Sequence, residues 1–411
     1  MRNKSVDLEE LASKLDISPT MHKYAEDRYK GIAELLNKNG IDAVFYPQGS
    51  FRTGTVVRPI KDNVDSDYDI DVVCEWTEAK DSLSPKQVKQ ETGTVLESDG
   101  TYSEKLLPED SRCWTLQYAE VVDGIGLKLD VVPCVKEAQS AVQQLISNGI
   151  PELYANQAVA ITDKTAQDAY HWLPSNPGGY GDWFDHINEP FLQANRATEK
   201  QRIFKSYRSM FSASAKAEEV PDYYIRSPLQ RSIQILKRHR DLYFSRGERF
   251  KNNRPASVVL TTLSARIADG APVQGVEQLL SYIVLGLSEY VTLLQGKCPA
   301  PRFTGDERTI IERRGAKWWI PNPVNPADNY ADSWTDLTAE LFFLWVSAVK
   351  KDLVDINPDE DTKYWTSLQT AFGPAFIKKA FGAKAETGKI EVNPPISPSL
   401  QRPTKPWGCS K

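Results

Sequence analysis

The chain has 411 residues, and its 50 basic residues against 55 acidic ones give a formal net charge of -5. This balance argues against a dedicated polyanion-binding protein, which usually carries a basic stripe, so we expect no stable binding to duplex DNA. Hydrophobic residues make up 40%, as in globular proteins, and no apolar run approaches the roughly 20 residues of a membrane span. The N-terminus lacks the apolar segment of a secretory signal, so we expect a cytoplasmic protein without membrane association.

The five cysteines form no CxxC pair, and the four histidines lie at no zinc-finger spacing from them. This pattern excludes a disulfide framework and a structural zinc site as starting hypotheses. A site for a hard cation, built from carboxylates, remains open.

The first part of the chain begins with a predicted helix over residues 6–38, in which Ser18 is a candidate N-cap followed by Pro19 in the first turn. The Asn-Gly pair after residue 38 ends this helix. A short strand is predicted over residues 41–46, and a turn over residues 47–50.

The best strand signal covers residues 68–76, where apolar residues alternate with acids. Residues 82–111 are polar and predict a helix with a loop. Two further strands are predicted over residues 115–122 and 127–132, joined by a hairpin turn at residues 123–126.

The second part of the chain reads as mainly helical. Helices are predicted over residues 229–244, 255–268, 273–294 and 337–354 from apolar positions at helical spacing. From about residue 385 the chain contains five prolines and no periodicity, which predicts a mobile tail.

Three acidic residues are the strongest candidates for chemistry. Asp69 and Asp71 are two positions apart on a predicted strand, so their side chains share a face and repel each other unless a cation lies between them. Asp130 is a lone acid in an apolar strand, where an unpaired charge is costly. If the two strands pair, three carboxylates converge at one edge of the sheet, and such oxygen ligands suit magnesium.

The segment beginning Gln48-Gly49-Ser50 precedes these acids. Its turn leads into a short helix, whose first amides and the Ser50 hydroxyl can contact a phosphate, while Gly49 allows close approach. An Asp-x-Asp pair alone is more often a solvated face, and a Gly-Ser turn alone is weaker still. The Gly-Ser turn, the Asp-x-Asp pair and the third acid in an apolar strand, in this order, make a far more specific signal.

These features carry a resemblance to a known family. Its most specific segments are residues 49–59, 67–73 and 129–133, with further matches at residues 175–184, 229–241 and 323–326. From about residue 18 to 380 the sequence resembles the polymerase-beta-like nucleotidyltransferase superfamily. Within it, the sequence is most similar to the cGAS/DncV-like nucleotidyltransferases (CD-NTases) of bacterial CBASS anti-phage systems.

The resemblance implies an α+β fold, with a polymerase-beta-like core sheet, a helical C-terminal domain like that of oligoadenylate synthetase, and an active site in the cleft between them. We expect the catalytic domain over residues 1–200, the helical domain over 201–384 and the tail over 385–411. The implied reaction joins ATP and GTP into a cyclic oligonucleotide, foremost a cyclic dinucleotide such as cyclic GMP-AMP. Two Mg²⁺ ions, replaceable by Mn²⁺, would be held by Asp69, Asp71 and Asp130.

The resemblance also implies that Lys237 and Ser257 hold the donor triphosphate. From the residues alone, Lys237 reads as one member of a solvated basic run over residues 237–240. Arg58 is a candidate for a nucleotide phosphate or base, and a surface ion pair is an equal alternative. His239 has no evident acidic partner in the sequence, so we do not expect it to act as a base.

Tyr180, Trp183 and Phe184 follow a predicted Pro-Gly-Gly loop, and an aromatic ring there can stack on a base. Core packing is the competing role for at least two of them.

Two other functions stay open: a linear nucleotidyltransferase that tails RNA or modifies a protein or small molecule, and a silent nucleotide-binding scaffold. The acidic balance disfavours RNA tailing, and the complete acidic set disfavours the scaffold. Regulatory or conjugating CBASS proteins are expected partners, with the C-terminal tail as a hypothetical attachment point.

Overall fold

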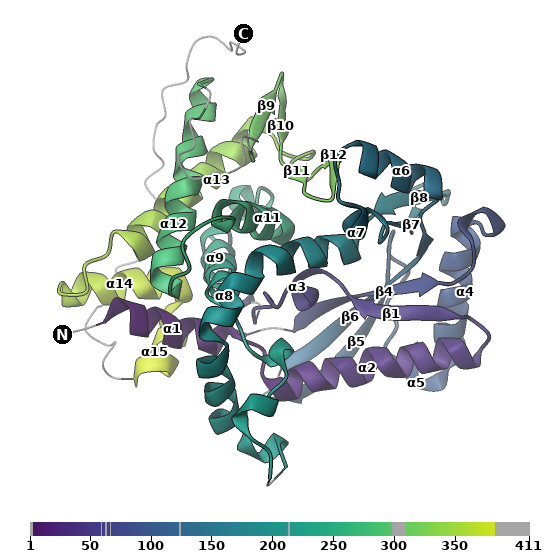
Figure 1. Ribbon diagram of the computed structural model, residues 1–411, viewed down its shortest axis with the longest axis horizontal. Coiled ribbons are helices and arrows are strands. Elements are labelled where there is room, and N and C mark those ends of the chain that lie inside the picture. The colour runs from purple at the N-terminus through teal and green to yellow at the C-terminus, as the bar shows by residue number, and fades with distance from the viewer. Residues whose placement is uncertain are drawn as a thin grey trace. The chain divides into compact units, whose positions relative to one another are not determined.

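The computed structural model describes residues 3–58, 60–61, 64–65, 67–122, 125–212, 214–297, 299 and 310–382 (Figure 1). The chain forms two compact units. The sheet unit comprises Asp16–Gln230 and Asn322–Ala327, and the helical unit comprises Met1–Leu15, Arg231–Pro321 and Asp328–Lys411. Residues 201–230 therefore belong to the sheet unit, whereas the sequence prediction placed the boundary between the two domains at residue 200. The tail expected over residues 385–411 lies outside the described residues.

The sheet unit contains a six-stranded mixed sheet with the order β1-β4-β6-β7-β8, in which β5 also pairs with β6. Its strands are β1 (Ala43–Pro47), β4 (Tyr68–Trp76), β5 (Trp114–Val122), β6 (Ile125–Lys136), β7 (Val159–Lys164) and β8 (Tyr170–Ser175). β4 and β6 pair in parallel, and the other pairings in this sheet are antiparallel. A separate small pair is formed by β2 (Ile60–Lys61) and β3 (Val64–Asp65).

The sheet unit also contains helices, named here in chain order. They are α2 (Pro19–Lys38), α3 (Gly49–Arg52), α4 (Pro85–Ser98), α5 (Gly100–Ser103), α6 (Gln139–Ser147), α7 (Glu152–Ala155) and α8 (Pro177–Ser206). One face of the sheet packs on α2 and α4 in a single apolar core. Its buried side chains include Met21, Ile32, Leu36, Ile70, Val72, Val88, Leu96, Leu129 and Val131. Because side chains alternate along a strand, the residues between these point to the opposite face.

The strand predictions at residues 68–76 and in the hairpin of β5 and β6 are confirmed. The predicted single helix over residues 6–38 is wrong, because the chain forms two helices, α1 (Lys4–Leu15) and α2. Pro19 starts the second one, and the Ser18 hydroxyl accepts a hydrogen bond from the Met21 amide at 3.1 Å. The predicted N-cap is therefore correct.

Several elements of the sheet unit were not predicted, among them β7, β8 and the long helix α8. The Pro-Gly-Gly segment predicted as a loop is the first turn of α8, which Asn176 caps by accepting a hydrogen bond from the Gly179 amide at 2.9 Å. This helix also contains Pro190, so both its start and its interior carry residues that usually interrupt helices.

The helical unit confirms the four predicted helical segments. Its helices are α1, α9 (Pro228–Phe244, which begins in the sheet unit), α10 (Glu248–Lys251), α11 (Ser257–Ala268), α12 (Val276–Glu289), α13 (Asp336–Val349), α14 (Asp361–Phe372) and α15 (Pro374–Phe381). A π-helical turn, Lys350–Val354, follows α13. Two small hairpins are formed by β9 (Glu312–Arg314) with β10 (Lys317–Trp319), and by β11 (Pro321–Asn322) with β12 (Asn325–Asn329).

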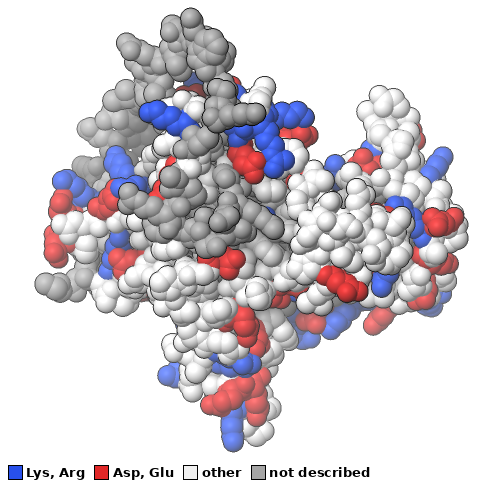
Figure 2. All heavy atoms as spheres, turned by 45° about the horizontal axis from the view of Figure 1, so that its top comes forward, with Lys and Arg blue, Asp and Glu red and all other residues white. Residues whose placement is uncertain are grey.

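Within the described part of the chain, no helix has the length and apolarity needed to span a membrane. On the face of the molecule shown in Figure 2, basic and acidic side chains are interspersed.

Candidate active site

The three predicted acids come from two adjacent strands of the sheet unit. Asp71 on β4 lies directly opposite Asp130 on β6 in the parallel register. Asp69 lies two positions before Asp71 and therefore shares its face, which is opposite to the face packed on α2 and α4. The structure thus brings the three acidic residues to one surface of the sheet.

The expectation that these acids meet at an edge of the sheet is wrong. β4 is flanked by β1 and β6, and β6 is flanked by β4 on one side and by β5 and β7 on the other. The acids therefore lie on the face of two inner strands. The sequence showed alternation within each strand but not the order of the strands.

The electrostatics of this face reflect the crowding of negative charge. Burial, followed by the charges of Asp130 and Asp69, raises the pKa of Asp71 to about 6. Desolvation also raises the pKa of Asp69, and Lys128, its neighbour on β6, opposes the shift. Three carboxylates crowd together beside Lys128 on this part of the face, so a divalent cation would complement their charge.

The sequence did not point to Thr115, which lies opposite Asp130 on β5. Its hydroxyl donates a hydrogen bond of 2.6 Å to Oδ1 of Asp130. The bond fixes one carboxylate oxygen, which leaves the other free to accept a ligand. A β-branched polar residue in a strand is common, so no sequence signal distinguished it.

The predicted phosphate-binding turn lies beside Asp71. The Gln48 amide donates a hydrogen bond of 2.9 Å to the Asp71 carbonyl, and α3 begins at Gly49. Gly49 has a φ of +60°, and a Cβ atom there would lie 2.9 Å from Oδ2 of Asp71. Glycine is therefore required twice, for the left-handed backbone and for the close approach to the carboxylate.

The remaining predicted nucleotide ligand of this unit is Arg58, which is half-buried and follows α3 in the chain. Ser50 is also half-buried, in the first turn of α3. Of the three aromatic candidates, Phe184 is fully buried and belongs to the core. Tyr180 and Trp183 are partly exposed, and the centroids of their rings lie 5.3 Å apart.

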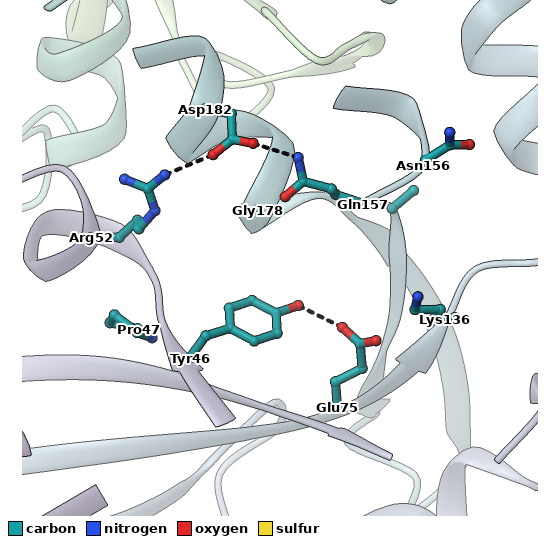
Figure 3. A pocket seen from close by; sticks show the side chains of 10 residues that line it. Tyr46, Pro47, Arg52, Glu75, Lys136, Asn156, Gln157, Gly178 and Asp182 are labelled. Carbon is teal, nitrogen blue, oxygen red and sulfur yellow. Dashed lines mark hydrogen bonds and ion pairs between the residues drawn. The ribbon is translucent and has the colours of Figure 1, made fainter. Parts of the chain in front are cut away.

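A pocket of about 350 Å³ lies on the same face of the sheet, adjacent to α3 (Figure 3). Its polar walls include Tyr46, Arg52, Glu75, Lys136, Gln157 and Asp182. Tyr46 donates a hydrogen bond to Glu75 at 2.8 Å, and Arg52 and Gln157 both contact Asp182.

In the helical unit, the basic run over residues 237–240 is buried, so its interpretation as a solvated face is wrong. Burial, followed by the nearby charge of Arg240, lowers the pKa of Lys237 to about 7. Arg240 donates hydrogen bonds to the Pro255 carbonyl at 3.1 Å and to the Ser257 hydroxyl at 3.0 Å. The sequence had not linked Arg240 to Ser257, which is exposed at the start of α11.

His239 has an acidic partner, contrary to expectation. Its Nε2 lies 3.2 Å from Oδ2 of Asp352, and its Nδ1 accepts a hydrogen bond from the Trp345 indole at 3.1 Å. Asp352 comes from the π-helical turn, far away in the chain, so adjacency in sequence could not reveal it. Both ring nitrogens are engaged within the buried core, which supports a structural role.

The acidic residues fit magnesium by their chemistry, since they supply oxygen ligands from one face of a sheet. The raised pKa of Asp71 supports this, because a cation would relieve the repulsion among the carboxylates. As the side chains stand, no group of three or more His, Cys, Asp or Glu residues among those described is arranged to hold a metal ion.

Comparison with known proteins shows what the chain is similar to. Residues 1–188 match the family described as the Second Messenger Oligonucleotide or Dinucleotide Synthetase domain. A protein of Roseivirga ehrenbergii named c-di-GMP synthase is 27% identical over 391 residues, which are 92% of this chain and 87% of that protein. The cyclic dinucleotide synthase CdnG of Bradyrhizobium diazoefficiens is 24% identical over 343 residues, covering 80% and 70% of the two chains. The chain is similar to CD-NTases over most of its length. It is a nucleotidyltransferase.

Solved structures of similar proteins share the fold of this chain. The structure of Bradyrhizobium diazoefficiens CdnG in complex with GTP matches 92% of this chain and 98% of that chain, with a TM-score of 0.63 and 20% identity. The structure of Escherichia coli MS115-1 CdnC with ATP matches 91% and 98%, with a TM-score of 0.55 and 14% identity. The predicted α+β fold with a helical C-terminal region is confirmed.

Proposed function

We propose that this protein is a CD-NTase that condenses nucleoside triphosphates, ATP and GTP, into a cyclic dinucleotide and releases pyrophosphate. The observation that carries the proposal is the pairing of Asp71 with Asp130, with Asp69 on the same face and the Gly49 turn against Asp71. Acidic residues beside an approachable turn are what transfer to an α-phosphate requires.

The chain's own residues have distinct roles in this proposal. The amides of Gly49 and Ser50 and the Ser50 hydroxyl bind phosphate oxygens of the donor. Lys237 and Ser257 bind the donor triphosphate, a role that rests on the family resemblance and on the buried ammonium group of Lys237. Arg58 contacts a nucleotide phosphate or base.

Asp69, Asp71 and Asp130 would hold magnesium, which when bound lowers the pKa of the attacking ribose hydroxyl and neutralises charge on the phosphates. Thr115 keeps Asp130 oriented through its hydrogen bond. Transfer forms a bond between the acceptor oxygen and the α-phosphorus, with the hydroxyl proton lost to solvent, and breaks the bond between the α-phosphorus and the bridging oxygen to the β-phosphate, so that pyrophosphate leaves. A second transfer closes the ring.

The identity of the bases is part of the proposal. One relative is named c-di-GMP synthase, and a solved structure of another contains GTP, which supports at least one guanine in the product. Cyclic GMP-AMP satisfies this condition. We further propose that the product is a second messenger in anti-phage defence, where regulatory or conjugating proteins act on the enzyme.

The experiment incubates the purified protein and Mg²⁺ with α-labelled ATP, GTP or both, followed by phosphatase treatment and chromatography of the products. A phosphatase-resistant guanine-containing product supports cyclisation. A phosphatase-sensitive product, or label in RNA or protein, supports a linear transferase instead. Absence of pyrophosphate release supports the silent scaffold.

Asp71→Asn is the matched variant for this experiment. We expect product formation to fall on the order of a thousand-fold, because the variant removes a charged ligand. In EDTA its melting temperature should equal or exceed that of the wild type, because asparagine relieves the cost of the buried, repelled carboxylate. Unchanged turnover by the folded variant would refute the proposed site.

A further inference from the structure

Helix α3 is too short to hold its own position. It contains four residues, Gly49–Arg52, and its first residue has a left-handed backbone. A single helical turn is unstable in isolation, because nucleation fixes several residues for few hydrogen bonds. The location of the phosphate-binding turn must therefore come from contacts with the rest of the sheet unit. Hydrogen bonds to backbone carbonyls join both ends of α3 to the unit, from the Gln48 amide to the Asp71 carbonyl and from the Gln230 side chain to the Thr53 carbonyl.

Arg52, the last residue of α3, adds side-chain contacts to α8. Its Nη2 lies 2.8 Å from Oδ1 of Asp182, and its Nη1 lies 2.7 Å from Oδ2 of Asp185, both on α8. The second oxygen of Asp182 accepts a hydrogen bond of 2.7 Å from Gln157 (Figure 3). One guanidinium thus bridges two carboxylates one turn apart on α8, and the fork shape of arginine suits this geometry.

The surface of α8 is shaped to receive this side chain. A Cβ atom at Gly181 would lie 2.6 Å from Nε of Arg52, so any side chain there would displace the guanidinium. The α8 residues Gly181, Asp182 and Asp185 therefore form a complementary seat for Arg52. We name this seat with Arg52 the α3 clamp.

The clamp acts on the active site through the backbone of α3. Gly49 begins the same helical turn and approaches Oδ2 of Asp71 so closely that no Cβ atom fits between them. If α3 moves outward, the gap between the phosphate-binding amides and the Asp71 carboxylate widens. Positioning effects of this kind change reactivity strongly even when stability changes little.

We propose that Arg52 is a positioning residue, which holds the Gly49–Ser50 turn at the correct distance from the acidic residues through its ion pairs with Asp182 and Asp185. This inference rests on the proposed function and names a residue of the same site that does not itself touch the reacting atoms. The competing interpretation is an ordinary surface ion pair, which contributes little to stability.

The control is Lys164 on β7, which forms a 2.8 Å ion pair with Glu109. The exposed fraction of its side chain, 25%, matches the 26% of Arg52. Lys164 also pairs with Asp168 at 3.1 Å, so Lys164→Ala removes a cation of similar exposure that is paired with two carboxylates, as Arg52 is.

The experiment compares full-length wild type, Arg52→Ala, Arg52→Lys, Asp182→Asn and Lys164→Ala. Hydrogen-deuterium exchange is measured on the peptide containing residues 48–55, and the Kd of a fluorescent GTP analogue is measured in the presence of Mg²⁺. We expect Arg52→Ala to accelerate exchange in this peptide and to weaken binding at least tenfold, at a melting temperature similar to that of Lys164→Ala. Arg52→Lys should restore part of the binding, because lysine can reach one carboxylate.

Equal effects of Arg52→Ala and Lys164→Ala on exchange and on Kd would overturn the proposal. A wild type that binds the GTP analogue but forms no product would reject the proposed chemistry, while the Kd values would still test the clamp. A wild type that fails to bind the analogue would overturn both.

Discussion

Lys237 lies in an environment that the sequence alone did not predict, because the residues indicated a solvated basic run and the side chain is buried. It is buried on α9, and its pKa is lowered to about 7 by burial and by the charge of Arg240. The nearby Asp241 opposes this shift. A lysine in this state is partly neutral at physiological pH, and an anion that binds beside it restores its charge.

This environment predicts that triphosphate binding depends on pH. Without ligand, Lys237 loses its proton as the pH rises through about 7, whereas a bound triphosphate raises its pKa. Binding therefore takes up a proton above pH 7, and affinity falls with increasing pH by up to about tenfold per unit.

The measurement is the Kd of a fluorescent GTP analogue between pH 6.5 and 8.5 in EDTA, compared with Lys237→Met. The variant should bind weakly and with a flat profile. An equally steep profile in the variant would assign the pH dependence to another group.

At the scale of single residues, Asp69, Asp71 and Asp130 were conspicuous in the sequence because each interrupts an apolar strand. An unpaired charge is costly to bury there, so such a residue suggests a bound cation. Thr115, Arg240 and Asp352 were not predictable. Each acts through a partner brought near by strand pairing or by a turn of another helix, and its residue type is ordinary for its position.

At the scale of elements, α3 can be tested through its first residue. Gly49 and Gly149 both have a positive φ, +60° and +87°, but a Cβ atom at Gly149 would meet nothing within 4 Å. Alanine at either position should cost about 1 kcal/mol of stability from backbone strain. Gly49→Ala should in addition lower product formation at least a hundred-fold, because its methyl group would crowd Asp71.

Urea unfolding and initial rates of product formation for the two variants provide the measurement. If Gly149→Ala lost activity to the same extent, strain alone would account for the effect and the contact with Asp71 would be irrelevant.

Among the elements, β4 was predictable over its full length because it alternates between core residues and acids. Helix α8 was not predictable, because its 30 residues carry a weak apolar stripe, start with Pro-Gly-Gly and contain Pro190. The seat for Arg52 on α8 was hidden for the same reason. Long-range packing, which the pattern of one segment does not encode, overrides these local signals.

At the scale of the whole molecule, His22 links stability to pH. It stacks on Phe51 at 4.3 Å and on Tyr223 at 5.1 Å, and burial together with the charge of Arg226 lowers its pKa to about 4. In the unfolded chain the His22 side chain binds a proton near pH 6.5, whereas in the folded chain this side chain stays neutral at that pH. Stability that is present above pH 6.5 is therefore lost as the pH falls toward 4.

We expect wild type to lose about 2 kcal/mol of stability from this group between pH 7 and pH 5. His22→Phe keeps a ring in the stack and does not titrate, so its loss over the same interval should be smaller by that amount. Urea unfolding at the two pH values measures the difference, which other titrating groups do not affect because both proteins share them. Parallel losses would show that His22 is not responsible.

Asp71 and Asp130 become neighbours only when β4 pairs with β6, and the chain between them contains α4, α5 and β5. Such non-local parallel pairing is slow to form and is completed late in folding. A polypeptide still emerging from the ribosome, with residue 130 inside the exit tunnel, has two of its three acids and no complete site. Under the proposed function, the enzyme is therefore inactive until β4 and β6 have paired, and a chain truncated before Asp130 makes no second messenger.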